Sequence, residues 1–146
     1  LVMSHLMLYH ASNMEITVSK IEKIVKTNGL FGVSTQYADS FSEHMALAHQ
    51  INPLIPAISA INFDVSQLKN VLAKHFSKVT QYDYTNVISW TKAESALQFT
   101  KMLISISMHN PSDEFYRHYY DALKKIIAKE GCFNTKFRVA FLLATK

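Results

Sequence analysis

The first 35 residues alternate between apolar runs and one helical pattern. Residues 1–4 are mostly apolar, and residues 12–15 then have the Ser-x-x-Glu form of a capping box. Apolar residues recur at helical spacing through 14–25, and Asn28-Gly29 can take the left-handed conformation that ends a helix. An apolar segment follows at once over 30–35. This order predicts a strand, a helix and a second strand parallel to the first.

The middle of the chain predicts two further helices and a strand. A second capping box at 40–43 opens a helix that reaches about residue 50. After a proline-bearing loop, Asp64 is the expected N-cap of a helix over 65–76, whose apolar residues share one face. The segment 79–90 is rich in aromatic and β-branched residues, which favours a strand.

The last third of the chain predicts two helices and a final strand. A third capping box lies at 91–94, and Asn110-Pro111 fits an N-cap followed by proline at the first helical position. The second of these helices ends at Gly131, and 137–145 is a nearly continuous apolar strand. The first and last strands are both apolar throughout, as expected when helices cover both faces of a sheet. Four strands alternating with helices predict an α/β fold.

The composition is that of a globular protein with a sizeable core. Of the 146 residues, 49% are apolar and 18% are charged. The sequence contains no apolar run of the ~20 residues that span a bilayer, and no basic-then-apolar leader. Cys132 is the only cysteine, so an internal disulfide is excluded, and we interpret this residue as a small packing residue. We expect a cytoplasmic location.

The net charge of +4 raises the question of nucleic-acid binding. Lys20, Lys23 and Lys26 lie on one side of a predicted helix, but Glu22 stands among them and the apolar stripe lies opposite. The chain has only two arginines, the residue best suited to phosphate recognition. We therefore interpret the lysines as a solvated face and expect no nucleic-acid partner.

Two segments carry a resemblance to a known family. LVMSHLMLYHASN (1–13) leads through a helix into IEKIVKTNGLFGVST (21–35), and this order resembles the middle of a class I S-adenosylmethionine-dependent methyltransferase. In that family a strand runs into an apolar-x-His pair, and the next helix ends in a Lys-Pro-Gly-Gly turn. Thr27 and Asn28 stand here in place of the proline and the first glycine. Residues 64–90 resemble the family's last helix and sixth strand, and 133–145 its antiparallel seventh strand.

The resemblance implies a Rossmann-like sheet with strands in the order 4-5-7-6, the last one antiparallel, and a helical insertion or lid at 91–131. Residues 1–146 would then be the carboxyl-terminal part of a single methyltransferase domain. The family's glycine-rich cofactor loop has no counterpart, because the only glycines are Gly29, Gly32 and Gly131. We expect that Leu1 marks the edge of a missing amino-terminal half, and that the fragment alone is inactive.

The function implied by the resemblance is methyl transfer from S-adenosyl-L-methionine to a small-molecule acceptor. We expect neither a nucleic acid nor a membrane as partner, but a homodimer or pairing with the missing amino-terminal half. The alternative is a non-enzymatic α/β interaction module that binds a partner through its sheet edge or its helical insertion, because a fold does not determine a function.

Candidate site residues lie where the first strands end, since open α/β sheets bind ligands beyond the carboxyl ends of their strands. By the resemblance, Ser4, His5 and Leu6 would face the methionine part of the cofactor. His10 would face the acceptor and act as a base if the acceptor is protonated. Both histidines also fit a structural role as caps of the strand-to-helix turn, and the sequence leaves the two roles open.

Aromatic side chains suit a cationic sulfonium, which gives a second set of candidates. The predicted substrate-binding residues are Tyr9, Tyr37, Tyr116 and Tyr120, with Tyr119 as a further candidate. Tyrosines at helical spacing are also common core residues, and that alternative stays open. His44 and His49 are five residues apart, roughly 140° around a helix, so they do not share a face and we expect no metal site.

Overall fold

The computed structural model describes residues 1–56, 65–106 and 111–146, and it divides into two compact units. Unit 1 comprises Leu1–Ala38, Ile61–Thr85 and Arg138–Lys146, and unit 2 comprises Asp39–Ala60 and Asn86–Phe137. In chain order the elements are β1 (Val2–His5), the 3₁₀ helix η1 (Leu8–His10), α1 (Met14–Ile24), β2 (Leu30–Gln36), α2 (Ser42–Ile51), α3 (Val65–His75), β3 (Lys78–Trp90), α4 (Ala93–Ile106), α5 (Asp113–Glu130) and β4 (Phe133–Thr145).

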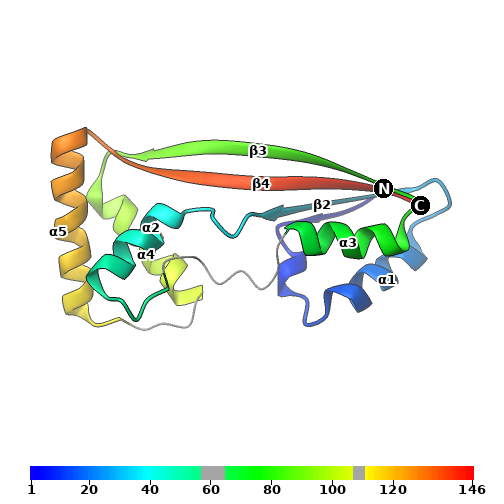
Figure 1. Cartoon of the computed structure of the whole chain (residues 1–146), viewed down its shortest axis with the longest axis horizontal. Helices are drawn as coiled ribbons and strands as arrows, with labels where there is room; N and C mark the ends of the chain where they lie inside the picture. Colours follow the sequence, from blue (N-terminus) through cyan, green and yellow to red (C-terminus); the bar gives the residue numbers. More distant parts are fainter. Residues whose placement is uncertain (57–64, 107–110) are drawn as a thin grey trace. The chain divides into compact units, whose positions relative to one another are not determined.

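The four strands form one mixed sheet in the order β1-β2-β4-β3 (Figure 1). β1 pairs with β2 in parallel, with Val2 opposite Phe31. β4 pairs with β2 in the antiparallel sense, with Ala144 opposite Phe31. The predicted α/β class, the parallel first pair and the antiparallel last strand are confirmed. The correspondence with the family's strands four to seven stays a prediction.

Unit 1 has a helical layer on one face of the sheet. Helices α1 and α3 lie side by side there (Figure 1). Their buried residues, such as Val18 and Leu68, join the strand residues of the core face, which are Val2, Phe31, Val33, Ala140, Leu142 and Ala144. Leu68 and Leu72 are fully buried, and each contributes roughly 2 kcal/mol of apolar burial.

The opposite face of this sheet carries the alternate residues of the same strands. We call it the open face, and its members are Met3, His5, Gly32, Ser34, Phe141 and Leu143. No helix among the described residues of unit 1 covers it, and Met3 is 55% exposed. Within unit 1 the expectation that helices cover both faces is therefore wrong for the residues described, because α1 and α3 pack on the same side.

Unit 2 is built from α2, α4, α5 and the neighbouring ends of β3 and β4. α5 packs against both α2 and α4. Its core is aromatic, with Phe41, Trp90, Phe99, Tyr119 and Phe133 among the clustered residues. The predicted insertion at 91–131 contains α4 and α5, which share this unit with α2. Their role as an insertion or lid stays a prediction.

α1 and α2 have N-caps other than the predicted ones. Asn13, not Ser12, caps α1, because its side-chain oxygen accepts from the Ile16 N–H. α2 follows Phe41, which is left-handed with φ 60° and gives no side-chain cap. The expected partner of that capping box, Glu43, instead accepts the backbone N–H of Lys136 at 3.1 Å. A predicted cap can thus be replaced by a neighbouring acceptor, as at Asn13, or lose its partner to a contact distant in sequence, as at Glu43.

The later boundaries show one more cap difference. Ser112 caps α5 by accepting the Phe115 N–H, so the helix does not begin at Pro111. Asp64 and Asn110 lie outside the described residues. Gly131 ends α5 in the left-handed conformation with φ 81°, as predicted. β4 begins before the predicted 137, because residues 133–136 alternate between buried and exposed.

Among the described residues, no helix has the length and apolar character to cross a membrane.

Candidate functional site

The carboxyl ends of β1 and β2 lie side by side in unit 1, and a buried hydroxyl joins them. His5 and Ser34 are direct partners in the strand register. Their side chains meet on the open face, with 2.6 Å between Ser34 Oγ and His5 Nδ1. The backbone N–H of Leu6 donates both to the Ser34 carbonyl at 3.1 Å and to Ser34 Oγ at 3.2 Å. Ser34 is buried, whereas His5 is exposed.

The turn that leaves β1 is strained. Leu6 has a φ of 49°, in the left-handed region that a residue with a Cβ avoids at a cost of about 1 kcal/mol. Strain of this kind gathers at ligand sites in proteins. Of the three residues predicted to hold the cofactor, His5 and Leu6 both form a hydrogen bond with Ser34 Oγ. The third, Ser4, lies opposite Val33 and so points toward the core face.

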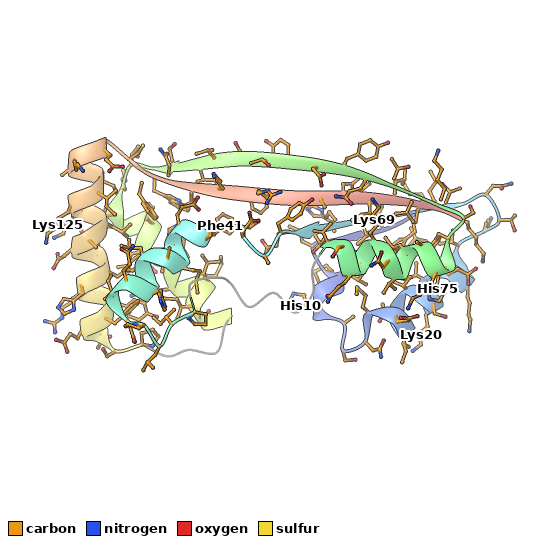
Figure 2. The ribbon with its side chains drawn as sticks, viewed as in Figure 1. His10, Lys20, Phe41, Lys69, His75 and Lys125 are labelled. Atoms are coloured by element: carbon orange, nitrogen blue, oxygen red, sulfur yellow. The ribbon has the colours of Figure 1, made fainter. Side chains whose placement is uncertain are left out.

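His10 is the last residue of η1 and is exposed (Figure 2). η1 lies beside β2, and its first residue, Leu8, is buried in the core of unit 1. These contacts fix the short helix just after the strained turn. The side chain of Tyr9 lies outside the described part of the structure. The role of His10, as a base or as a structural residue, stays a prediction.

Tyr37, directly after β2, is the centre of a polar cluster in unit 1. Its hydroxyl donates to Asp83 at 2.6 Å, and the Gln81 amide donates to both of them, at 3.2 and 2.9 Å. The hydrogen bond to Asp83 raises the pKa of Tyr37, and the same bond lowers the pKa of Asp83. The Arg138 guanidinium lies 4.2 Å from the ring centre of Tyr37. One ring face of this predicted substrate residue therefore already holds a cation.

Tyr116 and Tyr120, the predicted substrate residues of α5, lie together in unit 2. They line a groove of about 280 Å³ with Leu97, Lys101, Asp113 and Arg117. The Lys101 ammonium lies 5.0 Å from the Tyr116 ring centre. Desolvation raises the pKa of Tyr116, and the hydrogen bond that Tyr120 donates to Glu94 raises the pKa of Tyr120. The groove thus pairs aromatic rings with charged side chains.

His44 is a fully buried histidine in unit 2. Its Nδ1 lies 2.7 Å from Thr100 Oγ1 and 3.0 Å from the Tyr119 hydroxyl, so Tyr119 is a core residue here. Burial lowers the pKa of His44 to about 4. His49 Nδ1 instead donates to the Ile55 carbonyl at 2.7 Å. Within the described ranges, no three His, Cys, Asp or Glu side chains gather in a group that could hold a metal ion.

Several of these residues were not candidates from the sequence. Ser34 follows the apolar residues 30–33, and a hydroxyl at the end of an apolar strand segment is a usable signal. Gln81 and Asp83 alternate along β3 and so share one face of the sheet. Their partner Tyr37 is 46 positions away from Asp83, and only the sheet brings the two together.

The chain is similar in fold to two solved bacterial structures. A candidate methyltransferase from Bacillus halodurans aligns with 99% of this chain and 68% of its own, at 13% identity and a TM-score of 0.52. The YcgJ protein of Bacillus subtilis aligns with 99% of this chain and 62% of its own, at 12% identity and a TM-score of 0.54. The sequence matches no protein-family model and none of the curated proteins. The chain therefore shares an α/β fold with these two proteins over part of their length.

Proposed function

We propose that this chain supplies the carboxyl-terminal part of an S-adenosyl-L-methionine-dependent methyltransferase that acts on a small molecule. The strained, hydrogen-bonded end of β1 carries the proposal, because it lies where open α/β sheets bind ligands and holds His5 and Leu6 in place. The fold likeness to a candidate methyltransferase supports it.

The residues present fit only one part of the cofactor. The turn at His5 and Leu6 presents an imidazole and a bent backbone, which suit the polar methionine end. The glycines of the chain lie at positions 29, 32 and 131, so no glycine-rich loop follows a strand in these residues. When bound, S-adenosyl-L-methionine supplies an activated methyl group on a sulfonium.

In this proposal the residues of the chain align the reactants and manage a proton. Methyl transfer from a sulfonium is an in-line displacement, so positioning and the exclusion of water are what a protein contributes. His10 follows the strained turn by four residues and is exposed, so its imidazole can be reached by a protonated acceptor. Tyr37 is a poor base at neutral pH, because its hydrogen bond to Asp83 raises its pKa.

The test is transfer of a tritium-labelled methyl group by the longest natural polypeptide that contains residues 1–146. We expect activity with that polypeptide and none with residues 1–146 alone. His10→Ala should lower turnover and leave cofactor affinity nearly unchanged. His118→Ala, an exposed histidine on α5, is the matched control and should leave turnover unchanged. Equal turnover of the natural polypeptide and of its two variants would make His10 structural. A natural polypeptide that neither binds the cofactor nor transfers methyl contradicts the proposal.

A second candidate function is a non-enzymatic interaction module. The observation that favours it is the open face. Met3 on this face is more than half exposed, and so is Tyr82, whose ring centre lies 6.4 Å from that of Phe141. Apolar surface of this kind marks contact sites in soluble proteins. Calorimetric titration separates the two functions, because a module has no affinity for S-adenosyl-L-methionine in any natural length of the polypeptide.

A further inference from the structure

The direction of the hydrogen bond between Ser34 and His5 follows from the number of partners that the Ser34 hydroxyl has. A serine hydroxyl has one hydrogen to donate and two lone pairs to accept with. The Leu6 N–H occupies one lone pair at 3.2 Å, and the only other partner of this oxygen among the described residues is His5 Nδ1 at 2.6 Å. Ser34 is 3% exposed, so water offers no easy substitute.

Two arrangements of the hydrogen atoms are possible, and they differ in cost. If His5 Nδ1 carried the hydrogen, Ser34 Oγ would accept twice and its own hydrogen would have no acceptor. A buried donor without a partner gives up its hydrogen bonds to water and gains none in return, which destabilises the folded chain. If Ser34 donates to Nδ1, every group is satisfied. The second arrangement places the imidazole hydrogen on Nε2, because neutral histidine carries one N–H.

We infer that Ser34 is a positioning residue that holds His5 as the Nε2–H tautomer at the carboxyl end of β1. The same hydroxyl accepts the Leu6 N–H, so one buried atom fixes both the tautomer and the strained turn. His5 is exposed, and its Nε2–H is the donor that this end of the sheet presents to a ligand.

This assignment separates the chemistry of the two neighbouring histidines. With Nδ1 bound to Ser34 and Nε2 protonated, neutral His5 has no available lone pair and serves as a hydrogen-bond donor, not as a base. The Nε2–H of His5 therefore donates to an acceptor oxygen of the ligand, as in a carboxylate. The base of the site is then left to His10. The identity of the ligand rests on the proposed function, whereas the tautomer is a property of the chain alone.

The experiment is a long-range proton–nitrogen NMR correlation on ¹⁵N-labelled residues 1–146 at pH 8, without cofactor and at a concentration at which light scattering shows a monomer. We expect His5 in the Nε2–H form. Ser34→Ala should give a mixture of both tautomers, and Ser34→Thr should restore the Nε2–H form because it keeps the hydroxyl. Ser77→Ala, which removes a hydroxyl bonded to the Thr145 carbonyl in the same unit, is the matched control and should change nothing at His5.

The outcomes are decisive whatever the stability of the variants. Wild-type His5 in the Nδ1–H form overturns the inference without any variant. An unchanged pure Nε2–H form in a folded Ser34→Ala protein also overturns it, because the hydroxyl would then be irrelevant. Failure of the chain to bind S-adenosyl-L-methionine leaves this measurement intact, so the inference and the proposed function fail separately.

Discussion

His44 Nδ1 lies 3.0 Å from the hydroxyl of Tyr119, and both side chains are fully buried in unit 2. Thr100 Oγ1 completes the group at 2.7 Å from the same nitrogen. The imidazole is surrounded by the rings of Trp90, Phe99 and Phe133, whose centres lie 5.5, 5.3 and 5.0 Å away. Burial among these rings penalises the charged imidazolium, which lowers the pKa of His44 to about 4.

This environment predicts acid-sensitive stability in unit 2. The unfolded chain binds a proton at His44 below pH 6.5, whereas the folded chain does so only near pH 4. The contribution of neutral His44 to the free energy of unfolding is therefore fully present above pH 6.5. It is lost as the pH drops toward 4, by roughly 3 kcal/mol in all. Urea unfolding followed by the fluorescence of Trp90, the only tryptophan, measures this loss next to the imidazole.

Two variants isolate the contribution of His44. His44→Phe should remove most of the pH dependence between 6.5 and 4, because no group that titrates in this interval then remains among the rings of Trp90, Phe99 and Phe133. Tyr119→Phe should cost about 1 kcal/mol for the lost hydrogen bond and keep the pH dependence. A wild-type protein whose unfolding midpoint is constant over this interval would show that His44 is not held neutral by burial.

The left-handed conformation of Leu6 predicts an inverted order of stability. Valine retains more apolar surface than glycine, but its branched Cβ is poorly accommodated at a φ of 49°. We expect Leu6→Val to be less stable than Leu6→Gly by roughly 1–2 kcal/mol in urea unfolding. A valine variant as stable as the glycine variant would mean that the turn does not adopt this geometry.

The groove of α5 predicts an effect on selectivity. Tyr116 and Tyr120 are only partly buried, so replacing both with alanine should alter the acceptor preference of the natural polypeptide more than its melting temperature. Tyr119→Ala is the contrasting core variant and should cost roughly 3–5 kcal/mol, as aromatic truncations in cores do. A double variant with a lowered melting temperature and unchanged selectivity would mark both tyrosines as core residues.

The elements of the fold were predictable because their signals are local. The helical spacing of Val65, Leu68, Val71 and Leu72 gave α3 its correct core face, and all four are buried. The aromatic and β-branched segment gave β3 within one residue. The caps were less predictable, since a Ser-x-x-Glu pattern does not reveal that Asn13 offers a better-placed oxygen or that Glu43 bonds Lys136.

The candidate site depended on contacts that no local pattern encodes. His5 and Leu6 were predicted, but Ser34 was not, because its pairing with His5 is set by the register of β1 on β2. The ring of Tyr37 was expected to be available, yet Arg138 covers one face from the neighbouring strand. Sequence spacing identifies residues near a site, whereas the sheet decides which of them are already engaged.

The edge strand and the open face together predict self-association of residues 1–146. Among the described residues β1 pairs only with β2, so one of its edges has no strand beside it. On the open face, Met3 and Phe141 converge over Gly32, where a Cβ would lie 2.5 Å from the Met3 sulfur. An unpaired edge beside exposed apolar side chains is a template for another chain.

We therefore expect the chain to dimerise or aggregate at high concentration, measured by light scattering. Met3→Lys should reduce the association, because it places a charge on the open face. Ile24→Lys is the matched control, since Ile24 is 69% exposed on α1 and lies outside this face. The amides of Met3 and His5 alternate with that of Leu6, which faces β2, so they point to the unpaired edge and should exchange slowly only in the associated form. A monomer at high concentration with these two amides already protected would mean that β1 is not an open edge, and the methyltransferase assignment of this strand would have to be replaced.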